Sequence, residues 1–297
     1  MKFLKTVLSV AVFAIMATSC EKDDDILGGN YIEQDYTGSF SVLSKKGSDG
    51  KLVSVISEGT TYKFRWRADN TADIYIYNAK FSTFMPNGIS IAFEGLKWSY
   101  AVGNTDVKIL DVKDVVPTWV KMREQNMNDV SNYLVDEMKI SIFERRLGNF
   151  TPEYIPVINL SMKVGDVEVT AIQKQRVYFG TTAVVGESIF YPTPKPVYLV
   201  SLNPTTGLAT IDIYKAKFAD KMPAMDMKFE NIPFQVSNTG YTLASEEIIP
   251  SVKNVPYPQY AITNLNGNAT LSTGMDLRFN CIGFDVQAKL GFPILVE

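Results

Sequence analysis

The stretch IYNAKFSTFMP, residues 76–86, recurs as IYKAKFADKMP at residues 213–223. The two stretches share Ile-Tyr, Ala-Lys-Phe and Met-Pro at identical spacing. Further matches continue in register, with small gaps, as far as DVVP at 114–117 and EIIP at 247–250. Such extended internal similarity predicts two copies of one structural unit within the 297 residues. The fold is therefore decided by what one copy forms.

Both copies alternate apolar and polar residues with a period of two. The clearest segments are ADIYIY, ISIAFEG, PVINLSMKV, DVEVTAI, PVYLVSL, ATIDIY, MDMKFEN and MDLRFNC. This alternation is typical of antiparallel strands with one buried face. Many short strands joined by short turns indicate a sandwich or a barrel, and a barrel has no exposed edge. We therefore expect an all-β protein of two tandem antiparallel barrels, with the copies at 31–172 and 173–297.

One segment departs from this alternation. In PTWVKMREQNMNDVSNYLVDEM, residues 117–138, Met127, Val130, Leu134 and Met138 recur at helical spacing among charged residues. The sequence predicts an amphipathic helix inserted in the first copy. The second copy has SVKNVPYPQY at the corresponding place, where the prolines exclude such a helix. Because a duplicated scaffold often acquires a specific role where its copies diverge, the helix is a candidate lid or docking element.

The N-terminus has the pattern of a bacterial export signal. Lys2 and Lys5 precede an apolar run that is too short to span a membrane, and small residues precede Cys20. The sequence predicts a signal peptide at 1–19 and a polar tether at 20–30. The junction resembles the lipobox of bacterial lipoproteins, which implies that Cys20 is acylated. Several acyl chains hold a protein stably on a membrane, so the membrane is the first expected partner.

The residues after this cysteine bear on localisation. Lys22, Asp23 and Asp24 resemble the acidic export tag of Bacteroidetes lipoproteins that are displayed on the outer face of the outer membrane. The resemblance implies an outer-membrane lipoprotein on the cell surface. The alternative is that these charges are only a solvated spacer, with the protein on the periplasmic face.

Composition excludes several classes of function. The chain has no histidine, which removes His-based nucleophile activation and every His-containing metal site. Its 29 basic and 32 acidic side chains give a net charge of −3 without a long basic run, so nucleic acid is not an expected partner. Cys281 stands alone in the alternating LRFNCIGFDV and is expected to be a small buried hydrophobe. We expect no catalytic residues, no metal and no cofactor.

The second copy also carries a family resemblance over most of its length. The blocks IDIYKAKFADKMPAMDMKFENIPF and NLNGNATLSTGMDLRFNCIGFDVQAKLGF resemble the calycin-like (lipocalin-like) β-barrel domain of Bacteroidetes lipoproteins. The first copy resembles this domain mainly over 72–117. The resemblance implies up-and-down barrels in the cell envelope with a lipocalin-type cavity, and it supplies no catalytic residues. A barrel of about eight strands either fills its interior or holds one small ligand, and both alternatives remain open.

Aromatic residues are the candidate ligand-binding side chains. They line apolar cavities or stack on sugar rings, although core packing is their commoner role. We expect a noncatalytic binding module for a small apolar ligand, a glycan or an envelope protein. The alternative is a structural component of an envelope complex, which predicts an exposed apolar patch; a hydrolase that uses carboxylates alone is a remote alternative. The candidate residues are Trp66, Tyr75, Trp98, Trp119, Tyr191 and Tyr198.

Overall fold

The computed structural model describes residues 31–36, 38–82, 85, 87–119, 134–143, 157–185, 197–218 and 222–291. Every regular element among these residues is a β-strand, except one turn of 3-10 helix (η3) at Pro258–Tyr260. The predicted all-β class is therefore confirmed. No helix within the described ranges has the length and hydropathy needed to cross a membrane.

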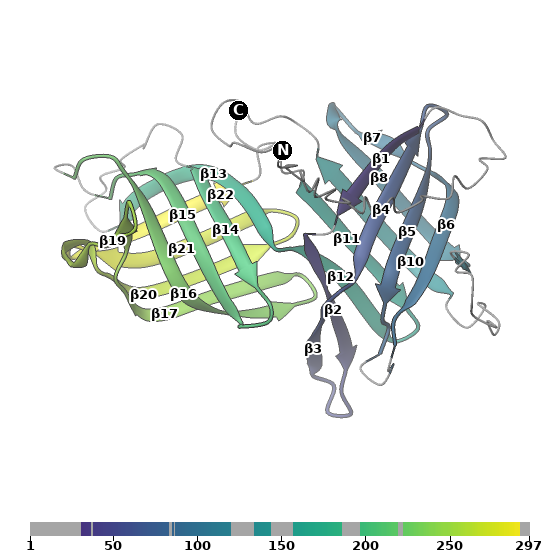
Figure 1. The fold of residues 1–297 in the computed structure, drawn as a ribbon, viewed down its shortest axis with the longest axis horizontal. Coiled ribbons are helices and arrows are strands. Elements are labelled where there is room, and N and C mark those ends of the chain that lie inside the picture. The colour runs from purple at the N-terminus through teal and green to yellow at the C-terminus, as the bar shows by residue number, and fades with distance from the viewer. Residues whose placement is uncertain are drawn as a thin grey trace, which may run out of the picture. The chain divides into compact units, whose positions relative to one another are not determined.

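The strands of the C-terminal half are β13 (Gln175–Val185), β14 (Val197–Asn203), β15 (Leu208–Ala216), β16 (Met225–Ser237), β17 (Gly240–Ile248), β18 (Ser251–Val252), β19 (Val255–Pro256), β20 (Ile262–Thr270), β21 (Gly274–Cys281) and β22 (Phe284–Gly291). They pair in the order β15-β14-β13-β22-β21-β20-β17-β16, and β16 returns to β15 (Figure 1). This ring is a closed antiparallel barrel of eight strands, as the sequence predicts for one copy. The short strands β18 and β19 extend from β16.

Aliphatic and aromatic side chains pack inside this barrel. Burial follows the strand alternation, so that Ile211 and Ile213 of β15 point inward and are fully buried. The ring of Phe279 makes edge contacts with Phe218 and Phe229, at centroid distances of 5.0 and 5.8 Å. Each fully buried phenylalanine contributes about 1.5–3 kcal/mol to stability. The barrel is therefore held together by a packed aromatic core.

The strands of the N-terminal half are β1 (Tyr31–Tyr36), β2 (Ser39–Lys46), β3 (Leu52–Ser57), β4 (Thr61–Arg67), β5 (Thr71–Ala79), β6 (Ile89–Lys97), β7 (Ser99–Ala101), β8 (Asn104–Val115), β9 (Thr118–Trp119), β10 (Val135–Phe143), β11 (Val157–Val164) and β12 (Val167–Gln173). They form a five-stranded sheet, β1-β4-β5-β6-β9, and a seven-stranded sheet, β3-β2-β12-β11-β10-β8-β7. Closure of this half into a second barrel remains a prediction.

The two sheets of the N-terminal half share one hydrophobic core. Phe64 and Ile74 from the five-stranded sheet lie in the same buried cluster as Ile140 and Leu160 from the seven-stranded sheet. Connections of at most three residues carry the chain between the sheets, from β1 to β2, from β3 to β4, from β6 to β7 and from β8 to β9. The sheets therefore fold as one body around a common interior.

A small cavity lies in this core beside Tyr62, whose hydroxyl shares a 2.7 Å hydrogen bond with Ser41. Phe64, Leu160 and Gln173 also line the cavity. Its volume is about 10 Å³, enough for about one water molecule. A typical small-molecule site encloses about 300 Å³ or more, so this cavity does not accommodate such a ligand.

The repeated stretch forms the same backbone structure in both halves. Asn78 and Lys215 occupy equivalent positions and adopt left-handed conformations, with φ of 54° and 59°. The pairing with the next strand shifts at both places. The bulge returns the following alanines, Ala79 and Ala216, to the core, where they are almost fully buried. The repeat in the sequence is therefore a repeat in local structure.

Methionine and phenylalanine complete this repeated unit. The Sδ atom of Met85 accepts a hydrogen bond from the backbone N–H of Phe81 at 3.2 Å. In the second copy Met222 accepts from Phe218 at the same distance. Because a buried N–H needs an acceptor, the sulfur satisfies the backbone just after strand pairing ends.

The predicted helix at 117–138 is wrong at both of its described ends. The first end belongs to strand β9, and Met138 lies in strand β10. Met138 and Ile140 are buried, whereas Lys139 between them is exposed, so the side chains follow a period of two. The core contacts of β10 determine its conformation here rather than the helical spacing further upstream. Residues 120–133 lie outside the described residues.

Hydrogen bonds connect the two halves. The hydroxyl of Thr170 on β12 donates to the backbone oxygen of Asn238 at 3.0 Å. The side-chain amide of Asn238 donates in turn to Glu168 at 2.8 Å. Only Lys174 separates the last strand of the N-terminal half from the first strand of the barrel. Residues 31–297 form one compact unit.

Candidate binding surfaces

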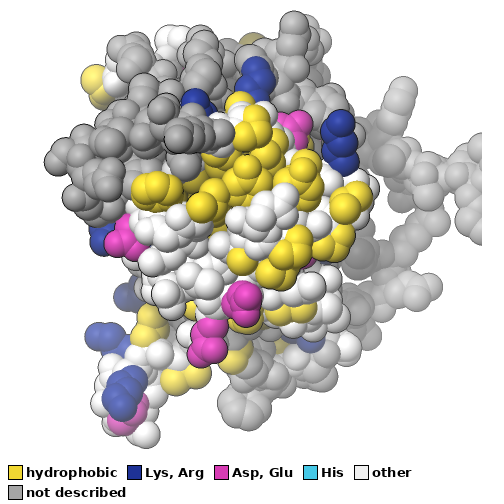
Figure 2. Space-filling model, turned by 90° about the vertical axis from the view of Figure 1, so that its left-hand side faces the viewer, with side chains coloured by type: hydrophobic (Ala, Val, Ile, Leu, Met, Phe, Trp, Pro, Cys, Tyr) yellow, Lys and Arg dark blue, Asp and Glu magenta, His cyan; other side chains and the backbone are white. Residues whose placement is uncertain are grey.

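Apolar side chains gather at one end of the C-terminal barrel (Figure 2). Strands β17 and β21 both end beside the start of β20, because Ile248 and Cys281 pair with Ile262. Three aliphatic side chains in the segments that follow are strongly exposed, Ile249 at 44%, Val255 at 58% and Ile282 at 46%. Two exposed prolines and two half-buried tyrosines lie beside them in the sequence that follows β18. Continuous exposed apolar areas mark interaction sites. We refer to this surface as the apolar end; it consists of Ile249, Val255, Pro256, Tyr257, Pro258, Tyr260 and Ile282.

A tight hairpin between β18 and β19 begins the apolar end. Val252 pairs with Val255 across a two-residue turn. The turn residues, Lys253 and Asn254, have φ of 52° and 62°. Two successive left-handed residues match the right-handed twist of the strands, as in a type I′ turn. The turn therefore fixes the position of the exposed Val255.

Turn η3 then holds the two tyrosines in place. The N–H of Tyr257 donates to the oxygen of Pro250 at 2.8 Å, and that of Ala261 donates to Pro258 at 3.0 Å. The rings of Tyr257 and Tyr260 are parallel within 3°, with centroids 5.8 Å apart. Proline and a bonded backbone reduce the freedom lost on binding. This part of the surface is therefore preorganised.

The turn between β21 and β22 supplies the third exposed side chain. Ile282 and Gly283 adopt φ of 54° and 79°. Glycine adopts this region freely, but a left-handed conformation costs other L-residues about 1–2 kcal/mol. Asn-Gly is the preferred pair for a two-residue turn of this kind. The left-handed backbone of Ile282 therefore lowers local stability, and its apolar side chain is exposed to solvent. Backbone strain of this kind clusters at functional sites.

The thiol next to this turn does not suit nucleophilic chemistry. Cys281 is 1% exposed, which confirms that it is buried. Burial raises its pKa to about 11, because an apolar surrounding disfavours the thiolate. The described residues also hold no group of three side chains suited to bind a metal.

A second candidate surface is an aromatic corner of the N-terminal half. The rings of Trp66 and Trp98 meet edge to face at 5.7 Å, and Trp98 meets Tyr100 in the same manner at 5.1 Å. The ammonium group of Lys108 lies 4.8 Å from the ring centre of Trp66 and 5.5 Å from that of Trp98. Such cation–π contacts stabilise by about 0.5–2 kcal/mol. Tyr100 is 48% exposed, so the corner reaches the surface.

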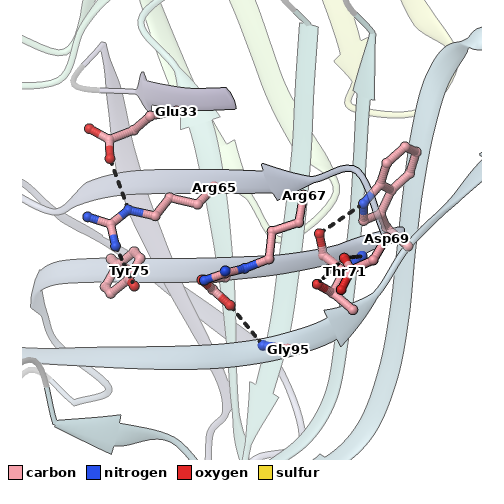
Figure 3. Close-up of polar contacts among 9 residues, drawn as sticks. Glu33, Arg65, Arg67, Asp69, Thr71, Tyr75 and Gly95 are labelled. Atoms are coloured by element: carbon pink, nitrogen blue, oxygen red, sulfur yellow. Dashed lines mark hydrogen bonds and ion pairs between the residues drawn. The ribbon is translucent and has the colours of Figure 1, made fainter. Parts of the chain in front are cut away.

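Polar contacts fix this corner (Figure 3). The indole N–H of Trp98 donates to the backbone oxygen of Thr71 at 3.1 Å. The hydroxyl and the N–H of Thr71 both donate to Asp69, and these bonds lower the pKa of that carboxyl. On the same strand, Asp73 accepts from the N–H of Gly95 at 2.8 Å and pairs with Arg67. The hydrogen bonds leave Trp98 little freedom to move.

The outer face of the five-stranded sheet carries an ionic network around Tyr75. Glu33 on β1 accepts from Lys63 at 2.8 Å and from Arg65 at 2.9 Å, both on β4. The hydrogen bond from Lys63 is the main cause of a lowered Glu33 pKa. Arg65 also donates to the hydroxyl of Tyr75 at 3.0 Å and stacks over its ring (Figure 3). Burial raises the pKa of Tyr75 to about 12.

The structure brings together some of the predicted site residues and separates others. Trp66 and Trp98 lie in contact at the aromatic corner. Tyr75 lies on the outer face of the same sheet, 8% exposed, and Tyr198 is fully buried in the C-terminal barrel with its hydroxyl 2.7 Å from Thr182. The side chain of Trp119 is not among those described. Cys20, Lys22, Asp23, Asp24 and Tyr191 lie outside the described residues.

Sequence reasoning missed the residues of the apolar end. The Ile-Gly pair at 282–283 interrupts LRFNCIGFDV only weakly, because isoleucine is a common strand residue. The signal that was present is glycine directly after it, since a lone glycine in an alternating stretch often marks a turn or bulge. Tyr257 and Tyr260 were visible only as part of a proline-rich loop.

Comparison with known proteins places no family on this chain. No protein-family model matches it, and no curated protein matches it. A crystal structure of a proposed outer membrane protein from Bacteroides fragilis is similar, with a TM-score of 0.31 and 11% sequence identity. The similarity covers 89% of this chain and 97% of that one. Both values are too low to transfer any property of that protein to this chain.

Proposed function

We propose that this chain is a noncatalytic, lipid-anchored protein of the cell envelope that binds a partner protein through its apolar end. The main support for this proposal is Ile282, whose side chain is 46% exposed and whose backbone is left-handed. A turn shaped by stability alone would hold asparagine there, whose side chain tolerates this conformation. The apolar side chain at this place is best explained by contact with a partner.

Packing favours an outer surface over an interior cavity. Phe218, Phe229 and Phe279 occupy the interior of the closed barrel. The cavity of about 10 Å³ beside Tyr62 holds about one water molecule. Within the described parts of the chain, a small apolar ligand of the lipocalin kind therefore has less support than a partner that docks from outside.

The chemistry of the apolar end favours protein over sugar. Burying its exposed aliphatic side chains against a partner contributes about 25 cal/mol to the binding free energy for each Å² of apolar surface removed from water. Sugar hydroxyls placed against Ile249, Val255 and Ile282 would lose water without gaining hydrogen bonds. Tyrosine is also enriched at protein interfaces, where its ring packs and its hydroxyl stays near water. An apolar protein patch fits this surface better.

The proposal of a noncatalytic role rests on residue types. The chain has no histidine to activate a nucleophile, and its buried Cys281 has a raised pKa. An enzyme would need to work with carboxylates, hydroxyls and lysine amines. Binding without bond-making is the simpler role for this composition.

Anchorage and display belong to the same proposal. The sequence before and after Cys20 supports acylation at that residue, and Lys22, Asp23 and Asp24 support export to the cell surface. Replacing Cys20 by alanine should move the protein from the membrane to the soluble fraction. Protease treatment of intact cells should remove the wild-type protein, and full protection would instead place it on the periplasmic face.

Site-specific photo-crosslinking tests the binding role. A photoreactive residue at Val255, introduced in the cell that makes the protein, should give a discrete adduct with one envelope protein. The same residue at Val102, which is fully exposed outside the apolar end, is the matched control and should not give that adduct. No adduct at Val255, or equal adducts at both positions, would count against the proposal. A partner recovered in fixed stoichiometry would favour the alternative role as a structural component of a complex.

Glycan binding at the aromatic corner is a second candidate. Trp98 and Tyr100 favour it, because partly exposed rings held by hydrogen bonds stack on sugars. Titration with cellohexaose, followed by tryptophan fluorescence, should then give a saturable change that Trp98→Ala removes and Tyr257→Ala retains. A flat titration in the wild-type protein would remove this candidate for β-linked glucans.

A further inference from the structure

Strand β3 is an edge of the seven-stranded sheet. It pairs with β2 on one side, and in the described part of the chain no strand pairs with its other side. Its first residues, Leu52 and Val53, are 44% and 56% exposed. An edge strand presents a row of N–H and C=O groups that can pair with a further strand.

The usual protection of edge strands is missing inside β3. Natural proteins place lysine, proline or a bulge on such edges. The strand reads LVSVIS, without a charge or a proline, and its pairing with β2 runs from Ser57 to Leu52 without a shift. Short apolar segments of high strand propensity associate readily with other strands. The sequence therefore keeps this edge competent for pairing.

The residues of this edge complement themselves. LVSVI, residues 52–56, reads as apolar, apolar, serine, apolar, apolar in both directions. Antiparallel pairing with a second copy about Ser54 places Leu52 opposite Ile56 of the other chain and Val53 opposite Val55. Apolar side chains directly opposite each other are in contact across the two strands and stabilise a sheet. We propose that β3 pairs with β3 of a second copy, which makes the chain a symmetric dimer.

The geometry of a sheet permits this register. Opposite residues of an antiparallel pair must point to the same side of the sheet. Leu52, Ser54 and Ile56 share one side, and Val53 and Val55 share the other, so every proposed pair meets this condition. A twofold axis through the Ser54 pair then relates the two copies. An interface of this type closes at two copies, because each edge occupies the other.

The dimer carries two apolar ends, so a membrane-anchored pair could bind two partner molecules at once.

Sedimentation velocity over a range of concentrations tests the dimer. The wild-type chain should shift from monomer to dimer as concentration rises. Val53→Lys should remain monomeric, because it places a charge opposite Val55 of the other copy. Val255→Lys is the matched control, since Val255 is 58% exposed but lies outside β3, and it should still dimerise. A wild-type monomer at every concentration, a Val53→Lys dimer or a series of larger species would overturn the proposal.

Cysteine crosslinking tests the register independently of affinity. In a chain carrying Cys20→Ser, a cysteine in place of Ser54 lies opposite its own copy across the twofold axis. Opposite Cα atoms in antiparallel strands are about 4.5–5.5 Å apart, within the range of a disulfide. Ser54→Cys should therefore form a disulfide-linked dimer on mild oxidation. Leu52→Cys, opposite Ile56, should form far less, and equal yields for the two variants would contradict this pairing.

Discussion

Met222 accepts a hydrogen bond from the backbone N–H of Phe218 at 3.2 Å, four residues before it in the chain. The same contact joins Met85 and Phe81 in the N-terminal half at the same distance. The spacing of phenylalanine and methionine in the repeated stretch is therefore a hydrogen-bonding requirement as well as a packing one. The stretch records a folding unit that the chain uses twice.

Replacing Met222 by leucine should remove this acceptor while keeping the volume. We predict a loss of about 1 kcal/mol in the free energy of unfolding, because the buried N–H of Phe218 is left unsatisfied. Urea unfolding measures the loss. Met227→Leu in the same core is the packing control and should cost less. Equal costs for the two variants would mean that the sulfur acts only by filling space.

The buried tyrosines predict an alkaline limit to stability. Tyr62 and Tyr198 share 2.7 Å hydrogen bonds with Ser41 and Thr182, and burial raises both pKa values from 10.0 to about 12. A raised folded pKa contributes stability that is full below pH 10 and is lost as the pH rises towards about 12. Unfolding free energies measured across this window should fall less steeply in the Tyr62→Phe, Tyr198→Phe double variant. An unchanged slope would show that other groups control the alkaline limit.

The ionic network on β1 predicts a weaker effect in acid. Lys63 and Arg65 lower the pKa of Glu33 below its usual 4.5. Because the folded pKa is depressed, the stabilisation is present above pH 4.5 and is lost as the pH falls through the folded value. The group is partly exposed, so the effect should not exceed about 1 kcal/mol. The protection of β1 amides against exchange, relative to the intrinsic exchange rate at each pH, should fall in acid, and Glu33→Gln should show the lower protection already at neutral pH. Slow exchange in that variant would refute the prediction.

Replacing Ile282 by asparagine should raise stability. Asparagine tolerates a left-handed conformation, so the variant should gain about 1 kcal/mol by relieving backbone strain. Thermal and urea unfolding measure the gain. Ile249→Asn, also at the apolar end, is the control. It should show no such gain, because Ile249 is not one of the residues with a positive φ. A loss of stability in Ile282→Asn would mean that the isoleucine packs within the fold.

The strand pattern of the sequence predicted much of this fold. The apolar and polar residues that alternate in ATIDIY are the buried and exposed residues of β15. The alignment of the two copies places Asn78 opposite Lys215, and both residues lie in bulges with a left-handed backbone. These features depend on local pattern, which sequence shows directly. The closure of the C-terminal barrel followed from the number and alternation of its strands.

Two features were beyond local pattern. Met138 fits both the helical spacing of the residues before it and the alternation of MKISIF. The strand forms here because β10 pairs with β8 and β11, which local sequence does not show. The apolar end brings together Val255 and Ile282, which lie in different hairpins of the barrel. Local sequence does not show which turns meet at one end of a barrel, so this surface could not be predicted from it.

The yield of the photo-crosslink from Val255, compared between the wild-type chain and Ile282→Asn, tests the central claim most directly. We predict that the discrete adduct falls at least several-fold in Ile282→Asn although that variant is the more stable protein. A variant that is folded, more stable and crosslinked as strongly as the wild type would contradict the proposal that the apolar end binds the partner.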